Sequence, residues 1–193
     1  MIVERPDFRA GAWAGRNLLL RFSASVISKE VQVPAYMKLG DIKGEATDQD
    51  HKDWIIIESM GSSIFRSVPQ GAKDQQRTKG ETTLGDIVCV RQLDKSSTKL
   101  QEACANGTFF KEVEVHFCTT VKNKQEPYLT YKLSHVIVST YSCHANASGD
   151  PLPSEEITLG FTAAEWTYVV VDPKTGDKTG QIPAKYNPAE GRS

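Results

Sequence analysis

The chain has 193 residues, a length that fits roughly one domain. Lys and Arg number 23 and Asp and Glu 24, so the formal net charge is −1 and no strong field draws the protein toward nucleic acid or anionic lipid. No apolar run approaches the roughly 20 residues that cross a bilayer, so a soluble protein without membrane insertion is predicted.

The first part of the chain only weakly resembles a targeting peptide. Its short apolar run, residues 18–20, is surrounded by four arginines: Arg5, Arg9, Arg16 and Arg21. The run is too short for the core of a signal peptide, and no small-x-small cleavage site follows it. An arm of uncertain role is therefore expected ahead of one folded domain.

Three strands are predicted next, over residues 35–41, 54–63 and 82–93. Between the second and the third, the polar stretch 67–80 has no apolar periodicity. A polar excursion of this length from a compact domain is either disordered or functional.

One helix is predicted within residues 94–107. Ser97 is a suitable N-cap, and Gly107 can adopt the left-handed conformation that ends a helix. Leu100, Ala103 and Cys104 form an apolar stripe at helical spacing. A helix of less than three turns does not persist alone, so this stripe is expected to dock on the strands.

Long strands with changes of phase follow the helix. In residues 112–121, Val113, Val115, Phe117, Thr119 and Val121 share one face, and Glu112, Glu114, His116 and Cys118 share the other. The apolar phase changes near Ser134 and His135 within 127–143, and near 163–165 within 155–172, where Trp166, Tyr168 and Val170 continue the buried face. Such changes indicate bulges that bend a strand.

A final hairpin is predicted from residues 169–171, through the turn-rich stretch 172–180, back to 181–186. Two long, bent strands favour a closed or nearly closed barrel. The predicted fold is mainly β: a compact antiparallel β-barrel of two sheets, with one short flanking α-helix and a long extended loop.

The four cysteines do not form a recognisable framework. Cys89, Cys104, Cys118 and Cys143 include no C-x-x-C pair, which argues against a zinc ribbon or a dense disulfide scaffold. They are interpreted as small hydrophobic side chains with free thiols, in a protein that folds in a reducing cytoplasm.

The most acidic stretch is GDIKGEATDQDHKDW, residues 40–54. Counted from Asp48 as a calcium loop, it has Lys52, Asp53 and Ser59 at positions 5, 6 and 12, where an oxygen ligand, a glycine and a glutamate are required. His51 has no nearby imidazole or thiolate in sequence to share a zinc ion. Its glycines and aspartates are typical of a polar turn between two strands.

Motifs for catalysis are also missing. There is no G-x-S-x-G, Walker loop, G-x-G-x-x-G or H-E-x-x-H. Cys118, or Cys143 with His144, could supply a thiol nucleophile and its base, but lone residues of these types in strands are more often structural. No aromatic platform accompanies the basic residues of the 67–80 stretch, which argues against nucleic-acid binding.

The sequence resembles the haemolysin-coregulated protein (Hcp) family, the tail-tube subunits of bacterial type VI secretion systems. The resemblance covers about residues 35–188. It lies in AYMKLGDIKGEATDQDHKDWIII, GETTLGDIVCVRQLDKSSTKLQEACANG, YLTYKLSHVIVSTYSCHANASGD and SEEITLGF.

The resemblance implies a β-barrel subunit that forms hexameric rings, which stack into a secreted inner tail tube. It also implies a carrier and chaperone role for effectors held in the lumen, with the spike and sheath components as further partners. Folding and assembly would take place in the bacterial cytoplasm, before export through the type VI system. The family implies no enzymatic activity, cofactor or metal.

Site residues also come from the resemblance. Subunit contacts are expected in the acidic turn and the long loop: Asp48, Asp50, His51, Ile64, Phe65, Val68, Gln76 and Arg77. Ser59 and Gly61 are the lumen candidates, although this sequence has Met60, Gly61 and Ser62 where the family more usually has an aromatic-serine-aromatic-glycine ending.

The predicted domain boundaries are an N-terminal extension, residues 1–33, and an Hcp-like tail-tube domain, residues 34–193. The extension is explained either by a true translation start near Val31 or Val33, or by an arm that packs on a ring surface. Two other functions stay open: a monomeric secreted β-barrel that binds a ligand such as a carbohydrate, and a metal-dependent hydrolase built on the acidic turn, with Asp50 essential.

Overall fold

The computed structural model describes residues 34–68, 71, 80–121, 124–145, 152–172, 175 and 177–190. All of them lie in one compact unit, Gln32–Ser193. The predicted extension, residues 1–33, lies outside the described residues. Gln76 and Arg77 of the long loop also lie outside them.

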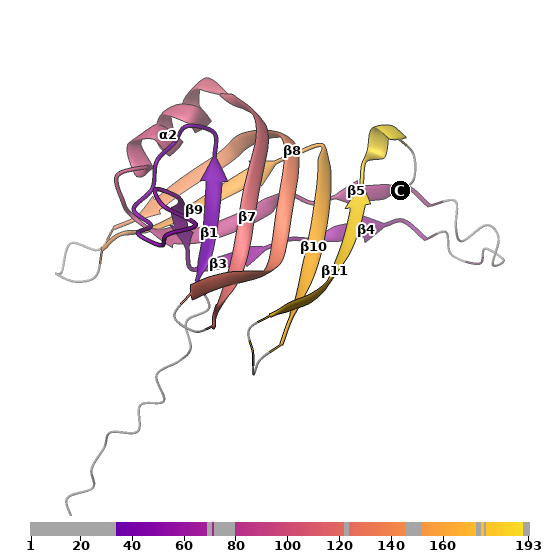
Figure 1. Ribbon diagram of the computed structural model, residues 1–193. Helices are drawn as coiled ribbons and strands as arrows, with labels where there is room; N and C mark the ends of the chain where they lie inside the picture. Colours follow the sequence, from indigo (N-terminus) through magenta and orange to yellow (C-terminus); the bar gives the residue numbers. More distant parts are fainter. Residues whose placement is uncertain are drawn as a thin grey trace, which may run out of the picture. The chain divides into compact units, whose positions relative to one another are not determined.

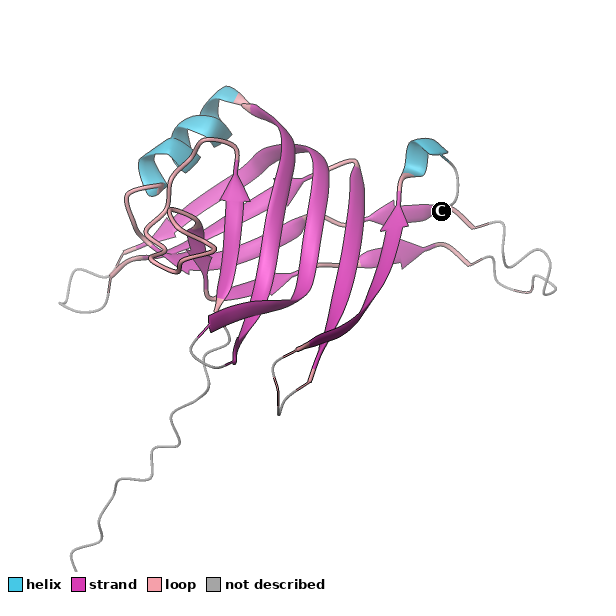
Figure 2. Cartoon of the chain, in the orientation of Figure 1, coloured by secondary structure: helices cyan, strands magenta, loops and turns pink. Residues whose placement is uncertain are grey.

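Strands make up most of the described chain (Figures 1 and 2). In order, the elements are β1 (Ala35–Leu39), β2 (Ile55–Ile57), β3 (Ser59–Gly61), β4 (Ile64–Arg66), β5 (Thr82–Leu84), β6 (Ile87–Gln92), α2 (Ser97–Asn106), β7 (Phe109–Val121), β8 (Lys124–His144), β9 (Ser154–Gly160), β10 (Ala163–Val171), β11 (Lys178–Tyr186) and the 3-10 turn η1 (Pro188–Glu190). The mainly β class, with one α-helix in the described residues, is confirmed.

The strands form two antiparallel sheets. The nine-stranded sheet has the order β2-β1-β7-β8-β9-β6-β3, and β10 and β11 branch from β8; β4 and β5 form the second sheet. Figure 1 shows β1, β7, β8, β10 and β11 side by side. The prediction of a closed barrel is wrong, because this sheet begins at β2 and ends at β3. These two strands are successive pieces of chain, separated only by Glu58, and do not pair with each other.

The branch depends on the long strand β8, which changes neighbours at His135. Residues 129–134 of β8 pair with β10, and residues 137–144 pair with β9. His135 has φ of 55°, and the buried phase moves from Leu133 to Val136 and Val138 on its two sides. The predicted irregularity near Ser134 and His135 is therefore confirmed, and it lets one strand serve both parts of the sheet.

Two predicted strands are divided for the same reason. The 54–63 strand divides at Glu58, since β2 pairs with β1 while β3 pairs with β6. The 155–172 strand divides at Phe161 and Thr162, since β9 and β10 lie along different parts of β8. In β10 the buried residues are Ala164 and Val169, so the prediction that Tyr168 and Val170 are buried is wrong.

Alternation along β7 predicted the core face correctly as far as Phe117. Val113 and Val115 are fully buried against β8. The register of β7 and β8 then shifts between Phe117 and Cys118. Cys118 stays on the predicted face, with His116, and both contact His51. It is buried there because residues 40–54 cover that face and form a small second cluster with it, which includes Tyr36, Ala46 and Trp54.

Helix α2 docks through Leu100 and Ala103, as predicted, and ends at Gly107 with φ of 61°. The predicted N-cap is wrong by one residue: Ser96, not Ser97, occupies that position, and it makes no side-chain cap hydrogen bond. The Ser97 hydroxyl is used elsewhere, because it donates to Glu155 and accepts from the backbone of Asp94.

Candidate functional site

The loop between β1 and β2, residues 40–54, is called the hairpin loop below. It folds back on itself through backbone hydrogen bonds: the amides of Gly44 and Ala46 donate to Asp53 and Trp54, and the amide of Asp53 donates to Ala46. A Cβ at Gly44 would lie 2.3 Å from the Trp54 carbonyl oxygen, so only glycine allows this close approach.

His51 attaches the hairpin loop to the strands beneath it. The residue is 2% exposed, and its ring stacks on Tyr36 with centroids 4.5 Å apart and makes a T-shaped contact with Trp54 at 5.0 Å. The His51 Nδ1–H donates to Asp48 Oδ1 at 2.7 Å, and His51 Nε2 lies 3.0 Å from His116 Nδ1 on β7. The His51 ring thus packs between Tyr36 of β1 and Trp54 of the loop, and it contacts His116 of β7.

The ionisable groups in this cluster are strongly perturbed. Burial alone would raise the pKa of Asp48, but hydrogen bonds from the His51 side chain and the Asp50 amide lower it below its usual value. Burial and the nearby charge of His51 lower the pKa of His116 to about 4. Burial and the charge of Asp48 raise the pKa of Cys118 to about 12.

Asp48, His51 and Cys118 stand in the order of an acid, base and thiol triad. Cys118 Sγ lies 3.8 Å from His51 Nε2, on the ring edge opposite to Asp48. The thiol is fully buried, however, and its raised pKa keeps it protonated. A nucleophilic cysteine needs an accessible thiolate, so this geometry does not support thiol catalysis.

Thiol reactivity checks this interpretation. All four cysteines are free; Cys89 and Cys118 are buried, and Cys143 is exposed. With excess Ellman's reagent near neutral pH, Cys143 is expected to react at once, while Cys89 and Cys118 react only after denaturation. A Cys143→Ser variant whose Cys118 still reacted rapidly in the native state would contradict the assignment of Cys118 as a structural residue.

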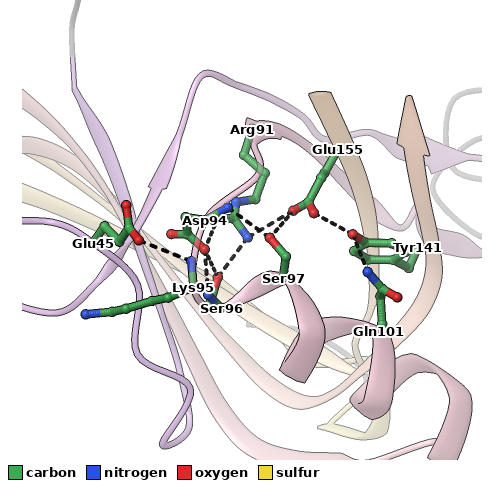
Figure 3. A network of polar contacts seen from close by, with 9 residues as sticks. All are labelled: Glu45, Arg91, Asp94, Lys95, Ser96, Ser97, Gln101, Tyr141 and Glu155. Carbon is green, nitrogen blue, oxygen red and sulfur yellow. Dashed lines mark hydrogen bonds and ion pairs between the residues drawn. The ribbon is translucent and has the colours of Figure 1, made fainter. Parts of the chain in front are cut away.

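A second polar cluster anchors the start of α2 (Figure 3). Arg91 on β6 and Glu155 on β9 are 1% and 0% exposed, and Arg91 Nη1 lies 3.2 Å from Glu155 Oε2. Arg91 also donates to Ser96 at 2.8 Å and pairs with Asp94 at 2.5 Å. The guanidinium therefore joins the helix entry to two strands of the core.

Glu155 is held by further donors. The Ser97 hydroxyl donates to Oε2 at 2.9 Å, and the Tyr141 hydroxyl donates to Oε1 at 2.5 Å. Burial and this bond to Glu155 raise the pKa of Tyr141 to about 12. Gln101 of α2 donates in turn to the Tyr141 oxygen. Helix, β8 and β9 are thus linked through one carboxylate.

Two apolar surfaces face solvent on other elements. The β4–β5 surface consists of Ile64, Phe65 and Val68, which are 55%, 62% and 49% exposed. Successive residues of a strand point to opposite faces, so exposure of both Ile64 and Phe65 means that neither face of this hairpin is covered.

The β10–β11 surface consists of Tyr168, Val170 and Ile182, which are 49%, 38% and 63% exposed. Tyr168 pairs directly with Ile182 across the two strands. β11 pairs only with β10, and Pro183 lies at its centre, where it removes a backbone donor from the open edge. Such an edge discourages unspecific strand pairing but leaves the apolar face available.

The structure places the other predicted site residues as follows. Asp50 is exposed, Asp48 is partly buried and His51 is buried, so any role of His51 in a subunit contact is through the shape of the hairpin loop. Ser59 and Gly61 are exposed on one side of β3, and Met60 packs against the core. A Cβ at Gly61 would meet nothing within 4 Å.

A groove of about 1040 Å³ lies between the hairpin loop, α2 and β7, and Phe109, Phe110, Lys99 and Lys111 are among its lining residues. In the described ranges no group of three or more His, Cys, Asp or Glu side chains is arranged to hold a metal ion. The same residues include no helix that is long and apolar enough to cross a membrane.

Sequence reasoning missed both polar clusters. For Arg91 and Glu155 a signal was present: each continues the buried phase of its strand, with Ile87 and Cys89 on β6 and with Ile157 on β9. The two residues also pair directly in register. For His51 and His116, which are 65 residues apart, no spacing or periodicity in the sequence pointed to a contact.

These features define a mainly β, two-sheet domain, in which helix α2 docks on the strands and the β4–β5 and β10–β11 surfaces are uncovered. The sequence model of the family described as "Type VI secretion system effector, Hcp" matches residues 36–168. The chain therefore belongs to the Hcp family of type VI secretion, as its motifs had indicated.

Individual relatives agree. Protein hcp1 of Pseudomonas aeruginosa is 29% identical over 136 residues, which cover 70% of this chain and 83% of that protein. A solved structure described as a type six secretion system protein has a TM-score of 0.76 at 27% identity, over 83% of this chain and 98% of the other. A type VI secretion system effector from Yersinia pestis, at 24% identity over 79% of this chain and 98% of that one, shares the fold with a TM-score of 0.62.

Membership sets the broad class of function. Hcp proteins are structural proteins secreted by the type VI system, and they are not an enzyme family. The expectation of a type VI secretion protein is confirmed at this level.

Proposed function

We propose that this chain is a subunit of the type VI inner tail tube, which assembles into hexameric rings that stack and are secreted. The observation that carries the proposal is the pair of uncovered apolar surfaces on different elements, the β4–β5 surface and the β10–β11 surface. A ring requires a heterologous contact, in which one patch meets a different patch on the next subunit. Two distinct patches on one protomer satisfy that requirement.

The low net charge and the exposed apolar side chains support self-association. The net charge of −1 gives little repulsion between copies. Burial of three large apolar side chains on each surface would supply a favourable term of roughly 1.5–3 kcal/mol for each side chain, before the entropy of association is subtracted. The ring size of six comes from the family resemblance alone.

Within such a ring, effectors would be carried in the lumen. Ser59 and Gly61 are proposed to face the lumen, because both residues are exposed on β3 and are small enough to leave space for cargo. Asp48 and Asp50 of the hairpin loop, and Ile64, Phe65 and Val68, are proposed as subunit contacts. The proposed spike and sheath partners follow from the tube role. No catalytic role is proposed, because the thiol nearest to a histidine base is buried.

Sedimentation velocity and negative-stain electron microscopy of the purified full-length chain test the proposal. The expected result is a species of six times the protomer mass and ring-shaped particles. A strict monomer at high protein concentration would contradict the tube role. If that monomer also bound a carbohydrate or other small ligand in the groove between the hairpin loop and α2, the ligand-binding alternative would replace it.

A further inference from the structure

We infer that the contact between His51 and His116 is an acid-sensitive lock that holds the hairpin loop on the β1–β7 surface, because this pair can take up one proton but not two. The inference concerns the fold of one protomer and does not depend on ring assembly. It follows from the geometry of two rings whose facing nitrogens are 3.0 Å apart.

The hydrogen atoms of the pair can be counted. The His51 Nδ1–H donates to Asp48, so His51 Nε2 alone faces His116 Nδ1. With both rings neutral, the His116 Nδ1–H donates to His51 Nε2. With one added proton, the His51 Nε2–H donates to His116 Nδ1, and the His116 Nε2–H is directed to Glu114 Oε2, 3.5 Å away. Both states keep the hydrogen bond between the rings.

A second added proton breaks this arrangement. Each facing nitrogen then carries a hydrogen, so two N–H groups oppose each other at the distance where one hydrogen bond stood. Two imidazolium cations would also lie with centroids 5.2 Å apart in a site that excludes most water. The contact must then open, and His51 must leave its place between Tyr36 and Trp54.

Charged and titratable groups of both signs surround the pair. The hairpin loop contributes Asp48 and the exposed Asp50, β7 contributes Glu114 and the Cys118 thiol, and β1 contributes Tyr36 and Lys38, whose ammonium lies 6.0 Å from the Trp54 ring. Lys178 of β11, paired with Glu126 of β8 at 3.0 Å, adds positive charge near His116.

The pKa of His116 agrees in direction. Burial, His51 and Lys178 lower it to about 4. A histidine with a depressed folded-state pKa favours folding fully above its unfolded value of about 6.5, and that contribution is lost as the pH falls from there toward 4. The hairpin loop is therefore expected to remain closed near neutral pH and to open in this acidic range.

Hydrogen exchange of the full-length protein tests the lock. The measured amides are those of Gly44, Ala46, Asp53 and Trp54, which form the hydrogen bonds of the hairpin loop. After correction for intrinsic exchange rates, their protection relative to the β8–β9 core is expected to fall at least about tenfold between about pH 7 and about pH 4.5.

His116→Asn is the decisive variant, because its amide can bond to His51 Nε2 but does not titrate. Its loop protection is expected to stay constant over the same range, and His144→Asn, at the exposed end of β8, is expected to behave as the wild type does. Loss of protection in His116→Asn equal to that of the wild type, or constant protection in the wild type, would overturn the inference.

Imidazole NMR of the wild type provides a readout that needs no folded variant. The His116 ring is expected to protonate well below pH 6.5, together with the loss of protection in the hairpin loop. If the ring protonated near pH 6.5 while the loop amides stayed protected, the lock would be ruled out.

Discussion

Replacement of Glu155 by Ala is expected to lower the free energy of unfolding by about 3–5 kcal/mol, because it removes the fully buried one of the two carboxylates that pair with the buried Arg91 guanidinium. Both side chains are almost completely buried, so solvent cannot replace the lost carboxylate. Ser97 and Tyr141 lose their acceptor as well. Urea unfolding followed by circular dichroism at neutral pH measures the effect.

Glu156→Ala is the matched control, since Glu156 is the next residue of β9 and points to the other, partly exposed face. It is expected to change stability by less than about 0.5 kcal/mol. The double variant Arg91→Met with Glu155→Leu is expected to be more stable than Glu155→Ala, because it removes both charges together. A cost of less than about 1 kcal/mol for Glu155→Ala would show that the ion pair does not anchor α2 to the strands.

Replacement of Ile182 by Glu is expected to abolish ring formation while leaving the protomer folded. Ile182 is 63% exposed in the protomer, so the change costs little in the monomer, yet it would place a charge inside the proposed interface. A loss of about 3 kcal/mol or more at each contact weakens association roughly 100-fold. Phe65→Glu, on the β4–β5 surface, is expected to have the same effect, and Leu152→Glu, at an exposed site outside both surfaces, is the control.

A mixture of the two variants distinguishes the kind of interface. If the contact is heterologous, Ile182→Glu and Phe65→Glu are each monomeric alone, and an equimolar mixture forms dimers through the one contact that joins two unaltered surfaces. Native mass spectrometry counts these species. Dimers of either variant alone would mean that a surface pairs with its own copy, and closed rings in either variant would remove these surfaces from the proposed interface.

Most of the local structure could be predicted because it depends on periodicity. Val113 and Val115 alternate with charged residues, so their burial followed from the sequence, and the stripe of Leu100 and Ala103 with Gly107 after it predicted a short docked helix. Arg91 and Glu155 follow the same alternation, but their burial was not predicted, because charged residues are not expected on a core face. Local alternation specifies which face a residue occupies, whatever its chemical type.

Periodicity failed where distant segments decide what covers a strand. Cys118 is buried because the hairpin loop covers its face of β7. In β10 the buried phase changes between Ala164 and Val169, which leaves Tyr168 and Val170 exposed. The sheet did not close into a barrel because β2 and β3 divide one stretch of chain between two neighbours. These outcomes depend on which strands lie side by side, and such information is not contained in one strand's pattern.

The sequence by itself therefore determined the class of the protein: its strands, the helix α2 and the motifs that place it in the Hcp family are local, and short-range sterics and alternation express them directly. Only the tertiary structure decided the contacts on which the predictions rest. His51 meets His116, and Arg91 meets Glu155, across 65 and 64 positions of chain, because the register of paired strands and the fold of one loop bring them together. The acidic stretch 40–54, which as a sequence offered a choice between a metal site and a turn, is in the folded chain a turn closed by the contact of the buried His51 with the half-buried His116.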